Sequence, residues 1–237
     1  MLSFVIPAYN EELELPSAIA AIQHAAQGQQ YEIIVVDDGS TDATAEIARS
    51  AGAEVVSINR RQIAAARNAG ARHARGDILF FVDADTHINE KHVAGAIAAL
   101  EDGCSGGGAR IAVDGAIPSW ASLFLKVVCP IYFALKLGAG AFLFTSRKIF
   151  DRVGGFDEKL FVGEEVYFSL ALRKLGRFRI LDEPVVTSGR KLRMYSGWEI
   201  LRHSSRLLLL GPRIARSRAG LEIWYDGKRE TRSTFTP

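Results

Sequence analysis

The chain has 237 residues, of which 48% are hydrophobic and 24% are charged, which is enough for one globular domain with a sizeable core. Its formal net charge of +2 at pH 7 is too small to indicate a nucleic-acid partner. The two cysteines, Cys104 and Cys129, lie far apart without a CxxC partner. This argues against a disulfide framework or a structural zinc site and favours a reducing, cytoplasmic compartment.

The first half alternates between apolar runs typical of buried strands and patterns typical of helices. Strands are expected at Leu2–Ile6, Glu32–Val36, Val55–Ile58 and Ile78–Val82. Helices are expected from near Asn10 through Ile22, over Thr41–Ala51 and Gln62–Arg75, and from an Asn89 cap to Leu100. Strands that alternate with helices predict βαβ units and a mostly parallel sheet. The first residues lack a basic region and a cleavage site, so we expect a first strand there rather than a signal peptide.

The second half is less regular. Strands are expected at Ser105–Val113, Ala141–Thr145, Phe178–Leu181 and Val185–Thr187. Helices are expected over Ser119–Leu137, Glu164–Leu175 and Trp198–Leu210. The longest apolar stretch is broken by Lys126, Pro130 and Lys136, so no segment is expected to span a bilayer. We find no repeat or linker, and we predict a single α/β domain over residues 1–237.

Two acids stand one residue apart at the end of a predicted buried strand, in Asp83-Ala84-Asp85. Paired carboxylates are costly unless a cation neutralises them. Mg²⁺ and Mn²⁺ prefer oxygen ligands and complete their shell with substrate phosphates. The pattern therefore predicts a divalent metal beside a diphosphate. The alternative is a turn with two solvated acids, because D-x-D is common.

The five histidines form no ligand set, and we expect His87 and His92 at the surface.

Other polar residues follow the first two predicted strands. Pro7, Tyr9 and Glu11 follow the first, and Asp37 and Asp38 end the second. Parallel strands bring these loops to the same edge as the D-x-D turn, where open α/β sheets bind ligands. A carboxylate can accept the imino N–H of a base, and an aromatic ring offers a stacking face. The edge therefore predicts a nucleoside-diphosphate site. Taken singly, each loop could instead be a turn or a helix cap.

These motifs closely resemble, in order and spacing, those of family-2 glycosyltransferases. The residues that carry the resemblance are Val5–Glu12, Ile33–Asp42, Ala65–Gly70 and Asp83–Asp85, and then an acceptor-side motif formed by Gly154–Glu158 and Gly163–Glu165. The resemblance runs from about residue 3 to residue 190. It implies a GT-A fold, with a Rossmann-like, mostly parallel central sheet flanked by helices. It also implies a UDP- or GDP-linked sugar donor, Mg²⁺ or Mn²⁺, and inversion at the anomeric carbon.

The resemblance also implies roles for individual residues on the donor side. It places Pro7, Tyr9, Glu11, Asp37 and Asp38 around the nucleoside, with Asp38 as the stronger candidate for the base contact. It places the D-x-D turn in contact with the donor. It also implies that Asp85 is the stronger metal ligand and that Asp83 is the second one. It implies a donor contact for Arg67, whose alternative is a charge on a helix surface.

A basic loop after the last predicted strand offers further cations. Arg190 in the loop Thr187–Arg193 could offset the charge of a departing diphosphate, with a solvated loop as the alternative. The resemblance divides the single domain into a nucleotide-sugar-binding half at 1–115, an acceptor-side half at 116–195 and a basic amphipathic extension at 196–237.

Inverting glycosyl transfer needs one carboxylate that takes a proton from the acceptor. Family members commonly carry Glu-Asp where this chain has Glu164-Glu165. The resemblance therefore implies Glu165 as the base, one methylene longer than usual, and Glu164 as its support. The alternative is that both acids only favour the helix N-terminus through its dipole. A glycoside hydrolase is disfavoured, because adjacent helical residues diverge by about 100° and cannot face each other across a sugar.

The acceptor is expected to carry a hydroxyl group, in a lipid-linked molecule or a cell-envelope glycan. Ile117–Leu137 is apolar on more than one face, and Trp198–Leu210 carries alternate arginines. Both are candidates for peripheral contact with the inner face of the plasma membrane. Alternatively, they complete the core or a dimer interface. The rival functions are a nucleotide-sugar-binding scaffold without turnover and a sugar-nucleotide pyrophosphorylase. A nicotinamide dehydrogenase is excluded by the lack of GxGxxG after the first strand.

Overall fold

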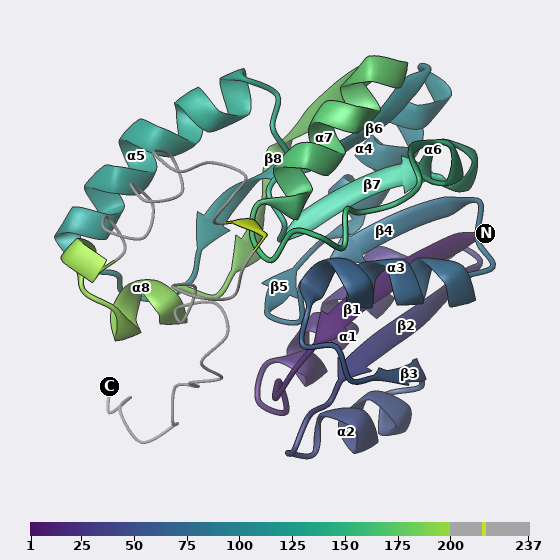
Figure 1. Cartoon of the computed structure of the whole chain (residues 1–237), viewed down its shortest axis with the longest axis horizontal. Helices are drawn as coiled ribbons and strands as arrows, with labels where there is room; N and C mark the ends of the chain where they lie inside the picture. The colour runs from purple at the N-terminus through teal and green to yellow at the C-terminus, as the bar shows by residue number, and fades with distance from the viewer. Residues whose placement is uncertain (200–214, 217–237) are drawn as a thin grey trace.

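The computed structural model describes residues 1–199 and 215–216. These residues form one eight-stranded sheet in the order β3-β2-β1-β4-β7-β6-β8-β5, covered by helices on both faces (Figure 1). The strands are β1 Leu2–Ala8, β2 Tyr31–Asp38, β3 Glu54–Ile58, β4 Ile78–Val82, β5 Thr86–His87, β6 Cys104–Val113, β7 Phe142–Ser146 and β8 Arg177–Thr187.

The pairing of the strands places the ends that carry the motifs at one edge. Strands β3, β2, β1 and β4 pair in parallel, as do β6 and β8. Strand β7 runs antiparallel between β4 and β6, and the short β5 runs antiparallel to β8. The expected α/β architecture with a mostly parallel sheet is therefore confirmed. The carboxyl ends of β1, β2 and β4 meet at the edge where the loops with the acidic residues lie.

Each central strand is buried on both faces, which explains its uninterrupted apolar sequence. Phe4 and Phe80 point into one core cluster and stack with their ring centroids 4.7 Å apart. Their neighbours Val5 and Phe81 point into the other cluster. The first cluster is covered by α1 Leu15–Ala25, α2 Thr44–Ser50 and α4 Glu90–Glu101. The second is covered by α3 Ile63–His73, α6 Arg147–Val153 and α7 Glu164–Leu175 (Figure 1).

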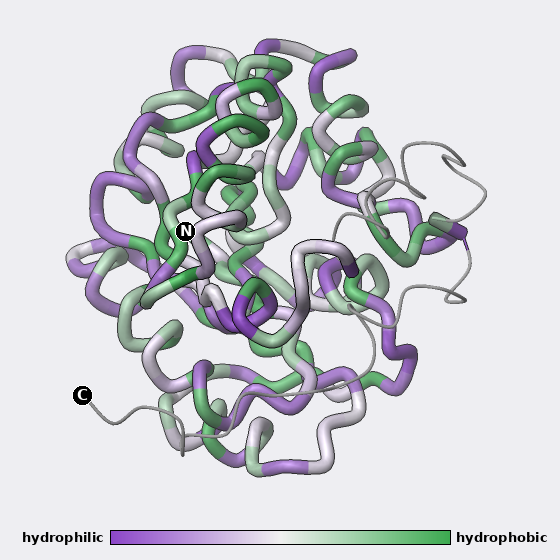
Figure 2. The backbone as a smooth tube through the Cα atoms, turned by 90° about the vertical axis from the view of Figure 1, so that its left-hand side faces the viewer, coloured by the Kyte–Doolittle hydropathy of each residue, from purple (hydrophilic) through white to green (hydrophobic). Residues whose placement is uncertain are grey.

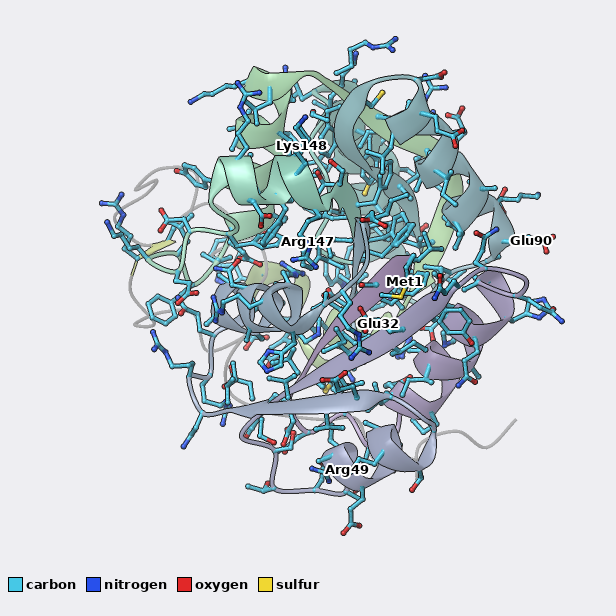
Figure 3. The ribbon with its side chains drawn as sticks, turned by 90° about the vertical axis from the view of Figure 1, so that its right-hand side faces the viewer. Met1, Glu32, Arg49, Glu90, Arg147 and Lys148 are labelled. Atoms are coloured by element: carbon cyan, nitrogen blue, oxygen red, sulfur yellow. The ribbon has the colours of Figure 1, made fainter. Side chains whose placement is uncertain are left out.

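Helix α3 lies unusually close to the sheet because of Gly70. A Cβ atom at this position would stand 2.3 Å from Cγ1 of Val5 and 2.9 Å from Cγ2 of Val36. The close approach carries Arg67, one turn earlier on the same helix, toward the end of β4. At the opposite end of α3, the Arg147 guanidinium donates to the carbonyls of Ala71 and Ala74 at 2.6 and 2.7 Å; the labelled Arg147 is visible in Figure 3.

Helix α5, Ser119–Ala134, packs little of its apolar surface against the sheet. Ala121 is its one buried residue, whereas Leu123 and Ile131 are 65% and 60% exposed. Within the described residues, α5 therefore does not complete the core, which contradicts one of the two alternatives weighed for it. The short helix α8, Arg190–Met194, lies on the same side of the molecule, which faces the viewer in Figure 2. Among the described residues, no helix is long and apolar enough to cross a membrane.

Several expected elements differ from the observed ones. Helix α1 begins at Leu15 rather than near Asn10, because Asn10 has a left-handed φ of 52° and instead accepts a 2.8 Å hydrogen bond from the Thr41 amide. Helix α2 begins at Thr44, since the Asp42 side chain caps its amide at 3.0 Å. The two short strands expected after α7 are one strand, β8, with a bulge opposite Ala109 and Arg110.

His92 is buried, contrary to the expected surface position. Its ring accepts from the Asn89 amide and completes a capping box at the start of α4. The expected helix Trp198–Leu210 lies almost entirely outside the described residues, as does most of the expected extension at 196–237. The expected three-part division of the domain stays a prediction.

Candidate active site

A cleft of about 170 Å³ opens at the carboxyl edge of the sheet, where β1, β2, β3 and β4 end. Eight of the residues expected at a donor site line it together, namely Pro7, Tyr9, Glu11, Asp38, Asp83, Ala84, Asp85 and Arg190. The expected convergence of the strand-end loops is therefore present. Asp37, Arg67, Glu164 and Glu165 do not line the cleft.

The D-x-D turn is held between β4 and β8. The Asp83 amide donates to the Ala141 carbonyl, and the Thr86 amide donates back to the Asp83 carbonyl, at 3.2 and 3.0 Å. Thr86 then pairs with Thr187 of β8, and the Ser188 amide donates to the Asp85 carbonyl at 3.2 Å. The turn thus has a fixed backbone, and the residues that follow β8 are brought directly over Asp85.

Arg67 is an internal ion-pairing residue rather than a charge on a helix surface. It is 1% exposed, and its guanidinium donates to Asp83 at 2.9 Å, to Glu164 at 2.7 Å and to the Gly140 carbonyl at 2.9 Å. These contacts join α3, the D-x-D turn and the first turn of α7. A direct contact of Arg67 with a donor stays a prediction.

Arg190 forms a second buried ion pair at the same edge. Its two terminal nitrogens donate to the two carboxylate oxygens of Glu11, each at 2.7 Å, and Nη2 also lies 3.0 Å from Oδ2 of Asp85. Although burial disfavours its charge, Glu11 and Asp85 raise the pKa of Arg190 above its ordinary value. Arg190 therefore remains charged and neutralises both acids.

The part of the cleft expected to hold a base is shaped by a loop after β3. The Asp38 carboxylate accepts the amides of Arg60, Arg61 and Gln62 at 2.6 to 2.8 Å, and this holds the loop beside the cleft. Arg61, with a φ of 50°, lays its guanidinium 3.2 Å from the centroid of the Tyr9 ring. Asp37 accepts the Ser40 amide at 3.0 Å and supports the turn from behind.

Glu164 and Glu165 open α7 but have different surroundings. Glu164 is buried against Arg67, whereas the structure shows no salt bridge to Glu165 within its described residues. Burial and the adjacent Glu164 charge raise the pKa of Glu165 to about 8, while Arg67 opposes the shift. The Glu164 and Glu165 charges also contribute to the raised pKa of Tyr132 on α5, which burial causes in the first place. A carboxylate with a pKa near neutrality is suited to exchange protons at physiological pH.

The acidic turn offers one or two carboxylates to a metal. Burial raises the pKa of Asp83 to about 6, although Arg67 lowers it. No cluster of three or more His, Cys, Asp or Glu side chains able to hold a metal occurs among residues 1–199 and 215–216. Mg²⁺ and Mn²⁺ accept such a site, because they are commonly bound through one or two carboxylates and substrate phosphates. The residues present therefore fit a hard divalent cation that shares its shell with a diphosphate.

Arg61 and Gln62 also line the cleft and were not expected there from the sequence, whereas Lys191, which lines it as well, belongs to the expected basic loop Thr187–Arg193. Arg61 and Gln62 follow β3, whose carboxyl end lies at the same edge as those of β1, β2 and β4. Their position directly after a third parallel strand is the signal from which they could have been expected. Lys191 adjoins Arg190 and shares its basic loop.

Comparison with known proteins agrees with this geometry. A family model described as Glycosyl transferase family 2 matches residues 3–156. The dolichol-phosphate mannosyltransferase of Pyrococcus furiosus is 31% identical over 191 residues, which cover 78% of this chain and 52% of the relative. The undecaprenyl-phosphate 4-deoxy-4-formamido-L-arabinose transferase of Shewanella sediminis is 37% identical over 111 residues, or 43% of this chain and 34% of the relative. The chain thus spans about half the length of these relatives or less.

Solved structures show the same fold. A mannosyltransferase of Pyrobaculum calidifontis in complex with GDP-Man and Mn²⁺ aligns with a TM-score of 0.65 and 21% identity, covering 95% of this chain and 68% of that one. TarS of S. aureus in complex with UDP-GlcNAc aligns with a TM-score of 0.62 and 21% identity, covering 95% and 71%. The expected GT-A fold is confirmed by this likeness.

The central position of Arg67 predicts a large loss of stability on its removal. Arg67→Gln leaves Asp83 and Glu164 without their counter-ion, so we expect the free energy of unfolding in urea to fall by about 3–5 kcal/mol. The matched control is Arg72→Gln on the same helix, because Arg72 is 65% exposed and lies 3.8 Å from Glu158. We expect the control to change stability by about 1 kcal/mol or less. Equal losses in the two variants would contradict the role given to Arg67.

Proposed function

The chain belongs to glycosyl transferase family 2, and we propose that it transfers a sugar from a nucleoside diphosphate to a hydroxyl acceptor. The observation that carries this proposal is the gathering of the donor-side residues around one cleft, with a half-buried Glu165 at the start of the neighbouring α7. The names of the two curated relatives reported above contain dolichol phosphate or undecaprenyl phosphate, which supports a lipid as the molecule that carries the acceptor hydroxyl. UDP- and GDP-linked sugars are the donors that we propose.

The nucleoside is proposed to lie against the loops after β1, β2 and β3. Pro7 and Tyr9 offer apolar contact to the base, and Asp38 offers a carboxylate oxygen to its imino N–H. Tyr9 is stacked by Arg61 in this structure, so the base would share or exchange this contact. The diphosphate is proposed to lie between the D-x-D turn and the basic residues Arg190 and Lys191.

Asp85, with Asp83 as the second carboxylate, would hold Mg²⁺ or Mn²⁺. When bound there, such an ion supplies positive charge that offsets the charge on a departing diphosphate. Arg190 can add a guanidinium to the same leaving group, since it already stands 3.0 Å from Asp85. Arg67 fixes Asp83 from behind through its 2.9 Å hydrogen bond and so keeps the turn in position.

Glu165 is proposed to take the proton of the acceptor hydroxyl while the oxygen of that hydroxyl attacks the anomeric carbon of the donor sugar and the bond to the diphosphate breaks. The attack comes from the face opposite the diphosphate, so the configuration is inverted. Glu164 supports this step: its charge raises the pKa of Glu165, and its ion pair with Arg67 anchors the first turn of α7. An alternative is a nucleotide-sugar-binding scaffold, which would use the same cleft without this proton transfer.

The side of the molecule that bears α5 is proposed to contact a membrane. A helix that is apolar all round requires an apolar partner, and α5 exposes Leu123, Val127 and Ile131, followed by the exposed Leu135 at its C-cap. No acidic residue occurs between Asp114 and Asp151, a stretch that contains Lys126 and Lys136. The nearby Trp198 is 73% exposed, and Gly197 before it packs on the Trp120 ring of α5. Exposed apolar, tryptophan and lysine side chains together suit an anionic lipid surface.

Replacing the proposed base tests turnover separately from donor binding. With UDP- or GDP-linked sugars and Mn²⁺, Glu165→Gln should lose about 10²–10⁴-fold in transfer rate while binding UDP or GDP as the wild type does. Rates are measured by nucleotide release and binding by calorimetry. The matched control is Glu46→Gln, since Glu46 also stands in the first turn of a helix but is exposed. Nucleotide binding without turnover in the wild type, over a broad acceptor panel, would favour the scaffold.

The raised pKa of Glu165 predicts the pH dependence of transfer. The base must be deprotonated to act, so kcat/KM should rise with pH and level off above about 8. Glu164, Arg67, Asp83 and Tyr132 are titratable groups that interact with Glu165. Glu164→Gln removes a negative charge beside Glu165, so the rise of kcat/KM should occur at lower pH in this variant. A rise at the same pH as in the wild type would contradict the assignment of Glu165 as the base.

The proposed membrane contact predicts salt-sensitive flotation with vesicles. The protein should float with phosphatidylglycerol vesicles at low salt, and Leu123→Glu combined with Ile131→Glu should abolish flotation by adding charge to the apolar face. The matched control is Leu13→Glu, because Leu13 is also exposed but lies in the loop between β1 and α1. Loss of flotation in the control alone, or no flotation of the wild type, would contradict the proposal.

A further inference from the structure

Arg190 contacts the carboxylate of Asp85, which is the expected ligand of the metal ion. Its Nη2 atom lies 3.0 Å from Oδ2 of Asp85 and 2.7 Å from Oε1 of Glu11, while Nη1 lies 2.7 Å from Oε2 of Glu11. The Arg190 residue is only 7% exposed, so water weakens these contacts little. One guanidinium therefore serves as the counter-ion for both Asp85, the expected stronger metal ligand, and Glu11 in the loop after β1.

The position of Arg190 is fixed by backbone contacts. Strand β8 pairs with β5 through Thr187 and Thr86, directly after the D-x-D turn, and the Ser188 amide donates to the Asp85 carbonyl. The Gly189 amide then donates to Asp114 at 2.8 Å, and Arg190 begins α8. Asp85 and Arg190 thus lie on two segments that are hydrogen-bonded to each other, namely the D-x-D turn with β5 and the residues that follow β8. The contact between Asp85 and Arg190 is therefore a consequence of the fold.

A dication on the Asp85 carboxylate would lie next to this guanidinium. Like charges in a buried site repel strongly, because few water molecules are present to screen them. Metal binding to the ligand-free protein must therefore either displace Arg190 from Asp85 or be weakened by it. A nucleoside diphosphate changes this balance, because its oxygens can accept hydrogen bonds from Arg190 and share the metal at the same time.

We propose that Arg190 holds the Asp85 carboxylate in the ligand-free protein and makes divalent-metal binding depend on the donor diphosphate. Glu11 keeps the guanidinium in the site through its two 2.7 Å hydrogen bonds while the contact with Asp85 is exchanged for the diphosphate. Arg190 thus imposes an order of binding, in which the metal enters with the donor. The inference rests on the proposed function.

Direct Mn²⁺ binding tests this dependence without any turnover. Free Mn²⁺ is measured by electron paramagnetic resonance, with and without UDP or GDP. The wild type should bind Mn²⁺ weakly alone and at least tenfold more tightly with a nucleotide. Arg190→Gln should bind Mn²⁺ alone at least tenfold more tightly than the wild type, and the nucleotide should tighten Mn²⁺ binding by a smaller factor than it does in the wild type. Asp85→Asn should lose Mn²⁺ binding in both conditions.

Two further variants separate the role of Arg190 from a change in net charge or a loss of folding. Glu11→Gln removes an acid from the same cluster but leaves Arg190 on Asp85, so it should not tighten Mn²⁺ binding in the absence of nucleotide. The double variant Arg190→Gln with Glu11→Gln removes the buried pair as a unit and keeps the net charge. It should be as well folded as the wild type by circular dichroism and should bind Mn²⁺ alone more tightly than Glu11→Gln.

The outcomes distinguish this inference from the proposed function. Suppose that the wild type binds Mn²⁺ with nucleotide, but that in the absence of nucleotide Arg190→Gln binds Mn²⁺ no more tightly than the wild type, and the double variant no more tightly than Glu11→Gln. The proposed role of Arg190 is then overturned, while the donor site stands. If the wild type binds no Mn²⁺ with either nucleotide, the proposed metal site falls, and this inference falls with it.

Discussion

Arg67 and Arg190 place two buried positive charges among the carboxylates at the carboxyl edge of the sheet, and the geometry of the site depends on them. Asp83, Asp85, Glu11 and Glu164 carry like charges that would repel one another in so confined a space. Arg67 pairs with Asp83 and Glu164, and Arg190 pairs with Glu11 and Asp85. The acids can therefore be kept close together, as a site for a metal and a diphosphate requires.

The same two arginines join the two halves of the chain. Arg67 and Glu164 are 97 residues apart in sequence, and Arg190 and Glu11 are 179 residues apart. One pair ties the first turn of α7, with the proposed base, to the D-x-D turn. The other ties the segment after β8 to the loop after β1. The distance between the proposed donor and acceptor sides is thus set by buried ion pairs, which are sensitive to the loss of either partner.

Much of the fold could be predicted because its signals are local. The apolar run before Asp83 predicted a strand buried on both faces, and Gly163 and Gly176 bracket α7 at the boundaries expected from sequence. The meeting of the loops after β1, β2 and β4 followed from parallel pairing. The partners of Arg67 and Arg190 could not be predicted, because a pattern within one helix or loop carries no information about an acid far along the chain. The same limit applies to α5, since an apolar sequence does not reveal whether its partner is the core or another surface.

We propose that the acidic edge of the sheet holds a divalent cation together with a nucleoside diphosphate. Crystals grown with Mn²⁺ and UDP or GDP test it most directly, because the anomalous scattering of manganese locates the ion independently of the protein atoms. We expect a peak at coordination distance from Asp85 and a diphosphate that contacts both the ion and Arg190. A nucleotide bound with no manganese at Asp85, and with Arg190 still on that carboxylate, would contradict it.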